Sequence, residues 1–127
     1  MQDCVSALVM PAPGEQWADP QLLLRFPEPS GGGQPWGHVD EPPPWAAGRG
    51  YRVIAGVALS ASRASDGCLA VWPGSHTRTI TNSALVELRA GDVVLMHPKL
   101  WHASTVNSGA WIRYAVYFRL LTARAGA

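Results

Sequence analysis

The chain has 127 residues, of which 47% are hydrophobic and 15% charged, and its formal net charge at pH 7 is +1. This composition predicts one folded domain over residues 1–127 and excludes a disordered tail. The near-neutral charge, without a lysine or arginine cluster, argues against nucleic-acid binding, and no apolar run is long enough to cross a bilayer. No basic segment followed by an apolar core opens the chain, so we expect a cytoplasmic protein. In that compartment Cys4 and Cys68 should be free thiols.

Short β-prone segments separated by turn residues follow one another along the chain. Proline and glycine interrupt residues 1–19, and the first apolar run covers residues 21–26. A glycine-rich loop at 30–35 leads to a predicted strand at 36–40, which must end at the three prolines that follow because proline cannot donate to a ladder. Residues 41–50 should form a mobile loop or substrate wall. The remaining predicted strands are 51–60, 68–72, 84–88, 93–96, 102–106 and 111–121.

Seven or eight short strands with few or no helices predict an all-β sandwich or jelly roll. No internal repeat is visible in the sequence. A short chain with an exposed sheet face should also pair with a second copy to cover that face, so we expect a homodimer.

Three residues suggest a metal site. His38 and Asp40 stand two apart, so on a strand their side chains point to the same face and can share one cation. His102 begins a later predicted strand and completes a set of two histidines and one carboxylate, which is typical of non-haem Fe(II) oxygenases. Taken alone, the His38–Asp40 pair could equally be an incidental polar pair on a surface strand. His97 is the rival third ligand, but it precedes Pro98 at a strand end and should face solvent.

Arg113 lies eleven residues after His102 in a run that is otherwise apolar and aromatic. On a strand it shares a face with Trp111, Ala115 and Tyr117, and this face should look inward. A buried arginine needs an anion, and its planar guanidinium can bind a carboxylate through two hydrogen bonds. The alternative is an exposed arginine on a strand surface.

Four blocks carry a family resemblance: residues 36–40 (Trp-Gly-His-Val-Asp), 66–76 (Asp-Gly-Cys-Leu-Ala-Val-Trp-Pro-Gly-Ser-His), 91–95 (Gly-Asp-Val-Val-Leu) and 102–113, from the second histidine to the arginine. In this order they resemble the phytanoyl-CoA dioxygenase family of Fe(II)/2-oxoglutarate-dependent oxygenases. The resemblance implies a double-stranded β-helix, a cupin-like jelly roll. It also implies a catalytic Fe(II) held by His38, Asp40 and His102, with O2 and 2-oxoglutarate as cosubstrates. Arg113 and Ser104 would hold the distal carboxylate of 2-oxoglutarate.

The sequence also departs from this family. Members are usually much longer, with helices before the His-x-Asp motif that carry part of the substrate site. Arg25 is a candidate for a second contact to 2-oxoglutarate, and His76 should make a structural hydrogen bond. Because relatives that halogenate replace the carboxylate, Asp40 favours hydroxylation, desaturation or cyclisation.

The substrate is expected to be a small, largely apolar metabolite of bacterial secondary metabolism. Trp36, Trp45 and Trp101 would wall its site, and no basic cluster offers a place for the phosphates of CoA. An alternative assigns these tryptophans, with Trp72 and Trp111, to the core. Two other functions stay open. One is a metal-binding cupin enzyme without 2-oxoglutarate, which has no need of Arg113; the other is a non-catalytic remnant that acts as a binding or assembly protein.

Overall fold

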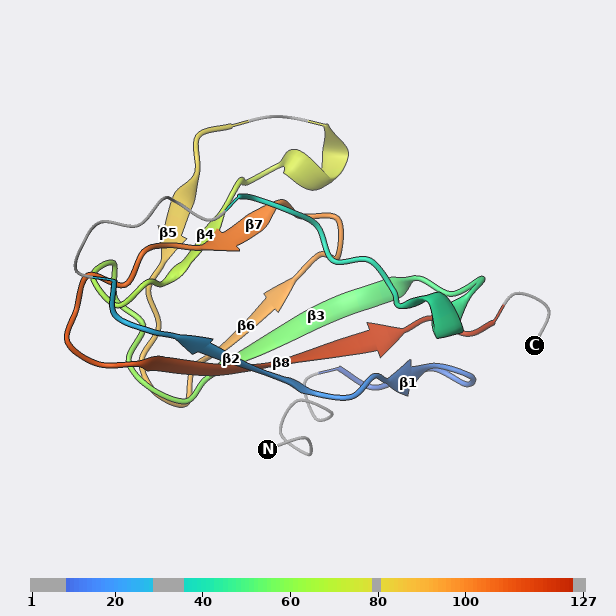
Figure 1. Ribbon diagram of the computed structural model, residues 1–127. Coiled ribbons are helices and arrows are strands. Elements are labelled where there is room, and N and C mark those ends of the chain that lie inside the picture. Colours follow the sequence, from blue (N-terminus) through green and yellow to red (C-terminus); the bar gives the residue numbers. More distant parts are fainter. Residues whose placement is uncertain (1–8, 29–35, 79–80, 125–127) are drawn as a thin grey trace.

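The computed structural model describes residues 9–28, 36–78 and 81–124. Two antiparallel sheets face each other across a common interior (Figure 1). The larger sheet contains β1 (Gln16–Trp17), β2 (Gln21–Arg25), β3 (Tyr51–Ala58), β6 (Val93–Met96) and β8 (Arg113–Leu121), and the smaller contains β4 (Leu69–Val71), β5 (Ala84–Val86) and β7 (His102–Ser104). Within these ranges the only helical elements are two short 3-10 turns, η1 (Pro44–Ala46) and η2 (Ser75–Thr77). The predicted all-β jelly roll is confirmed.

Strand β8 organises the larger sheet. Along one edge it pairs with β3, and along the other it pairs first with β2 and then with β1, so that Leu23 lies opposite Ala115 and Trp17 opposite Leu120. Its sequence is rich in aromatic and β-branched residues, which suits a strand with neighbours on both sides. β6 completes this sheet beyond β3, and the smaller sheet has the order β5-β4-β7.

The core lies between the two sheets. Alternate residues of each strand point to opposite faces, so one set meets the facing sheet. This inner set brings together Ile54, Leu69, Met96, Ala115 and Tyr117. Gly56 of β3 leaves room for the Tyr117 ring, because an added Cβ there would lie 2.7 Å from Tyr117 Cε1. The opposite face of the larger sheet has its own cluster, with Trp17 packed edge-on against Phe118.

All of the predicted strands except 93–96 are too long by one residue or more. Two of these differences have a local cause. Residues 36–40 do not form a strand: a single bridge joins His38 to His102, and the prolines that follow remove the donors a longer ladder would need. The last strand begins at Arg113 rather than Trp111. The side-chain amide of Asn107 donates a hydrogen bond to the Trp111 carbonyl at 2.8 Å. This contact holds Trp111 in the preceding turn, where it is 83% exposed.

Other predictions fall differently on the described residues. Cys68 is a buried free thiol whose pKa is raised by burial. Cys4 and the glycine-rich loop at 30–35 lie outside the described residues. β1 was missed, because two residues are too few to show a pattern. No helix in the described part of the chain is long and apolar enough to cross a bilayer.

Candidate metal centre

The side chains of His38, Asp40 and His102, which we call the metal group, converge at one end of the smaller sheet. His38 and His102 face each other across an antiparallel bridge, each backbone N–H donating to the other's carbonyl at 3.0 Å. This pairing brings their rings to a centroid distance of 4.6 Å. One ligand atom from each of the three residues lies within 4.8 Å of the others. The structure therefore brings together the three residues that the sequence analysis selected, although the segment with His38 and Asp40 pairs with β7 through a single bridge.

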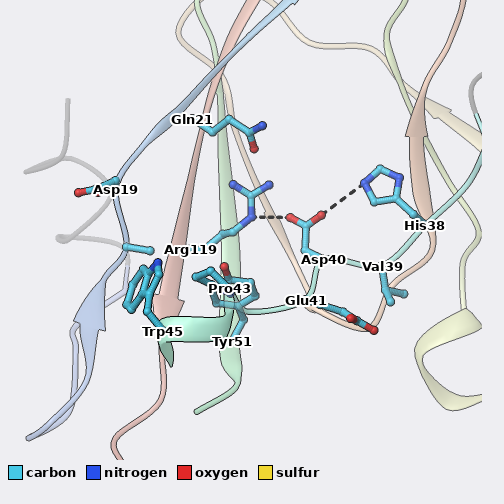
Figure 2. A pocket seen from close by; sticks show the side chains of 11 residues that line it. Asp19, Gln21, His38, Val39, Asp40, Glu41, Pro43, Trp45, Tyr51 and Arg119 are labelled. Carbon is cyan, nitrogen blue, oxygen red and sulfur yellow. Dashed lines mark hydrogen bonds and ion pairs between the residues drawn. The ribbon is translucent and has the colours of Figure 1, made fainter. Parts of the chain in front are cut away.

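The two oxygens of Asp40 have different partners. Oδ1 lies 3.4 Å from His38 Nε2 and 3.5 Å from His102 Nε2. Oδ2 accepts a hydrogen bond from Arg119 Nε at 2.5 Å (Figure 2). Arg119 comes from β8 and was missed by the sequence analysis. Its signal was present, because it stands six residues after Arg113 on the same face of one strand.

The protonation states of Asp40 and His102 suit metal binding. Burial raises the pKa of Asp40, but hydrogen bonds with His102 and Arg119 outweigh burial and bring the pKa to about 2, so the carboxylate is ionised at neutral pH. His102 Nδ1 lies 2.9 Å from the Leu100 carbonyl. Because a carbonyl only accepts, Nδ1 carries the proton in neutral His102, and Nε2 presents its lone pair toward the group.

We predict that metal affinity falls as the pH drops through the pKa of His102. Burial lowers this pKa, but the hydrogen bonds to Asp40 and to the Leu100 carbonyl raise it above the usual 6.5. Protons therefore compete for Nε2 at a higher pH than at a free histidine. Titration with Mn(II), followed by electron paramagnetic resonance from about pH 8 to about pH 5, measures this competition. Equal affinity across that range would contradict it.

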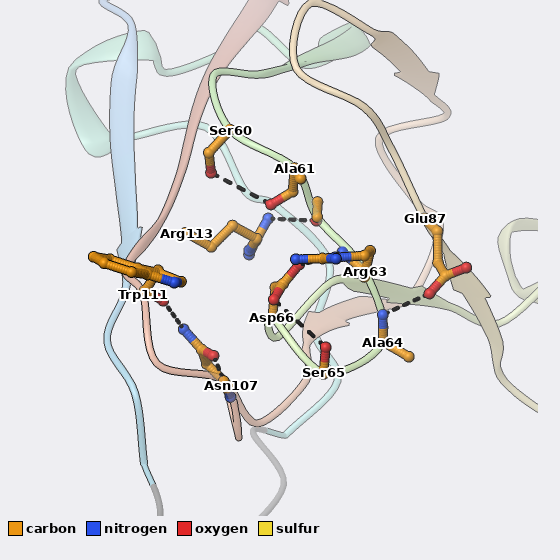
Figure 3. A network of polar contacts seen from close by, with 12 residues as sticks. Ser60, Ala61, Arg63, Ala64, Ser65, Asp66, Glu87, Asn107, Trp111 and Arg113 are labelled. Carbon is orange, nitrogen blue, oxygen red and sulfur yellow. Dashed lines mark hydrogen bonds and ion pairs between the residues drawn. The ribbon is translucent and has the colours of Figure 1, made fainter.

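Arg113 is a buried cation without an acidic partner. Its residue exposure is 3%, and no ion pair includes it among the described residues. One terminal nitrogen donates to Ser104 Oγ at 3.0 Å and the other to Ser62 Oγ at 3.5 Å, beside the turn that carries Ser60 and Asp66 (Figure 3). Its Nε is buried without a hydrogen-bond partner. The interior thus holds a guanidinium that hydroxyl groups alone do not satisfy.

A pocket of about 530 Å³ opens beside the metal group. His38, Asp40 and Arg119 form one side, and Tyr51 and Trp45 line it as well (Figure 2). Three residues of the 41–50 segment, Glu41, Pro43 and Trp45, line this pocket, and Trp45 belongs to η1.

The other predicted tryptophans lie elsewhere. Trp36, Trp72 and Trp101 line a second pocket of about 570 Å³, and Trp111 lines a third of about 140 Å³ that reaches Arg113. A core role is wrong for Trp36, Trp45, Trp101 and Trp111, which are all exposed.

Three other candidates lie outside the metal group. His97 is exposed, its Nδ1 accepts from the Lys99 backbone, and its ring sits 5.0 Å from that of His76. Arg25 donates from Nε to the Thr105 carbonyl at 2.9 Å, so it braces a loop. This makes His102 the histidine that joins His38 and Asp40.

A family model described as phytanoyl-CoA dioxygenase matches residues 2–115. The chain belongs to the phytanoyl-CoA dioxygenase family. The resemblance inferred from four sequence blocks is thereby confirmed. Among curated protein sequences no match is found.

Solved structures share the fold of this family member. The epimerase SnoN from nogalamycin biosynthesis, described as non-heme and alpha-ketoglutarate-dependent, is 21% identical with a TM-score of 0.69, over 89% of this chain and 51% of SnoN. The non-heme monooxygenase ThoJ in complex with nickel is 25% identical with a TM-score of 0.70, over 94% and 49% of the two chains. AviO1 from Streptomyces viridochromogenes Tue57 is 24% identical with a TM-score of 0.67, over 89% and 52%. The chain thus spans about half the length of these structures.

The donor set of this phytanoyl-CoA dioxygenase family member fits a divalent first-row metal. Two imidazole nitrogens and one carboxylate oxygen on one side suit an octahedral ion such as Fe(II), with the remaining positions open. Ser104 and His102 lie two residues apart on the inward face of β7, which is about 6.6 Å along a strand. Arg113 donates a hydrogen bond to Ser104. The separation between its guanidinium and the metal group is therefore close to the length of a short dicarboxylic acid.

Proposed function

We propose that the chain is the core of an Fe(II)/2-oxoglutarate-dependent dioxygenase. His38, Asp40 and His102 would hold the iron, and Arg113 with Ser104 would bind the distal carboxylate of 2-oxoglutarate. The observation that carries this proposal is Arg113, which is 3% exposed, has no acidic partner within the described part of the chain and leaves its Nε without a hydrogen bond. Burying such a charge is costly unless an anion joins it.

The separation of the two sites supports 2-oxoglutarate in particular. Its keto-acid end can chelate a metal and its other end is a carboxylate, so it requires a metal and a cation one five-carbon chain apart. β7 offers this separation, because His102 belongs to the metal group and Ser104 to the Arg113 cluster. A cupin enzyme without 2-oxoglutarate would need no second, buried cation at this distance.

Each residue then has a defined task. With O2 and 2-oxoglutarate, bound iron would supply oxidation of a substrate C–H bond, and succinate and carbon dioxide would leave. His38, Asp40 and His102 would hold the ion, and Arg113 would orient the cosubstrate through its distal carboxylate. Since Asp40 fills the place that a halide would need, hydroxylation, desaturation or cyclisation is favoured over halogenation.

We propose a small, largely apolar metabolite as the substrate, placed in the pocket beside the metal group. Val39, Pro43 and Trp45 give that pocket its apolar wall. Structures with related folds support a place in secondary metabolism: SnoN comes from nogalamycin biosynthesis, and one of its structures is a complex with Fe3+, alpha-ketoglutarate and nogalamycin RO.

Anaerobic titration of the protein with Fe(II) and then 2-oxoglutarate tests this function. We expect a metal-to-ligand charge-transfer band when 2-oxoglutarate joins the iron, and succinate when O2 and a suitable substrate are admitted. Iron binding without any response to 2-oxoglutarate would favour the cupin alternative. Absence of iron binding would favour a non-catalytic binding or assembly protein.

A further inference from the structure

We propose that Arg119 is a positioning residue that restricts Asp40 to one metal-coordinating oxygen. This inference rests on the proposed metal site and goes beyond it, because it assigns a task to a residue that does not contact the metal. Arg119 Nε binds Oδ2, whereas Oδ1 faces Nε2 of both histidines. The carboxylate is thus already divided between an arginine side and a metal side.

The pair is fixed from both ends. The side chains of Asp40 and Arg119 are only 9% and 16% exposed, so most of the surface of each is covered by protein. Arg119 lies within β8, opposite Ile54 of β3, and its carbonyl accepts from the Ala18 backbone at 2.8 Å. The hydrogen bond between the two side chains comes from Nε, and the guanidinium lies between Asp40 and Gln21 (Figure 2). The guanidinium therefore approaches Asp40 through Nε alone and holds a single oxygen.

The number of oxygens that Asp40 contributes decides how many coordination positions of the metal stay open. An aspartate can bind a metal through one oxygen or through both, and an octahedral ion has six positions. Two histidines and a one-oxygen aspartate leave three positions, enough for the two donor atoms of 2-oxoglutarate and for O2. An aspartate bound through both oxygens leaves only two. By occupying Oδ2, Arg119 keeps the third position available.

The alternative is that the ion pair between Arg119 and Asp40 only stabilises the fold. The two roles differ in the number of water molecules on a metal bound without cosubstrate. Mn(II) alone can be used as the probe, because broadening of its electron paramagnetic resonance lines by oxygen-17 water counts bound water. We expect three waters in the unmodified protein, two in Arg119→Met, and three again in Arg119→Lys, which restores a donor to Oδ2.

Two variants serve as matched controls. Arg113→Met removes a guanidinium from the same face of the same strand without touching Asp40. Arg52→Met removes an arginine that pairs with Glu15 at 2.8 Å. Both should keep three waters.

The proposal is overturned if Arg119→Met folds and still holds three waters, or if Arg119→Lys holds two. Should Arg119→Met fail to fold, the unmodified protein and Arg119→Lys still test the proposal, because two waters in either would show that Asp40 uses both oxygens although Oδ2 has a donor. No arm requires 2-oxoglutarate or turnover. A failure of the proposed oxygenase function would therefore be seen separately, as a missing charge-transfer band with a normal water count.

Discussion

Replacing His38, Asp40 or His102 by alanine should abolish stoichiometric Fe(II) binding while the β fold persists. Each substitution would remove one of the three proposed ligands, and no other group of three side chains that could hold a metal occurs among the described residues. His38→Ala is the cleanest test, because its side chain is 58% exposed and contributes little to the core. Asp40→Ala leaves Arg119 without its carboxylate, so this variant should also lose stability.

Anaerobic equilibrium dialysis with Fe(II) measures the stoichiometry, and circular dichroism checks the fold. His97→Ala is the matched control, since His97 is an exposed histidine five residues before His102 and lies outside the group. It should bind one iron like the unmodified protein. If all three alanine variants also bind one iron tightly, the metal site is elsewhere.

Arg113→Met should separate stability from cosubstrate binding. In the iron-loaded protein it removes a charge-assisted contact of about 1.5–3 kcal/mol, so 2-oxoglutarate affinity should fall about 10- to 150-fold. In the metal-free protein the same change should not lower the melting temperature, because it replaces an unpaired buried charge by an apolar side chain of similar length. A merely structural arginine predicts the opposite pattern.

The charge-transfer titration and thermal unfolding report these two quantities on the same sample. Ser104→Ala is a milder variant for comparison, because it removes one hydroxyl that accepts a hydrogen bond from Arg113 and keeps the guanidinium. Its loss of 2-oxoglutarate affinity should be the smaller. Unchanged affinity in iron-loaded Arg113→Met would instead support the cupin reaction without 2-oxoglutarate.

Local sequence pattern located most of the strands and the three residues His38, Asp40 and His102. β6 was predicted to the residue, because a Gly-Asp turn and a proline delimit a short apolar run. His38 and Asp40 were found because a spacing of two brings side chains together even in a short extended segment. The inward face of Arg113, Ala115 and Tyr117 followed from the same alternation, and all three are buried.

Long-range register could not be read from the sequence. Arg119 meets Asp40 across 79 residues, and nothing local shows that β8 passes beside the segment after His38. The locations of the tryptophans could not be predicted for a related reason. A large apolar side chain suits the core or the rim of a pocket equally well, and only the assembled sheets decide between these places. Trp111 shows this most clearly, since the Asn107 contact keeps it out of β8.

The central position of β8 has a consequence for synthesis. On the ribosome β1, β2 and β3 all emerge before the strand that joins them, and they must wait for it over sequence separations that slow folding. The smaller sheet is complete once Ser104 has emerged, and by then His38, Asp40 and His102 have emerged as well. In chain order, His38, Asp40 and His102 therefore all precede both Arg113, which binds Ser104, and Arg119, which binds Asp40.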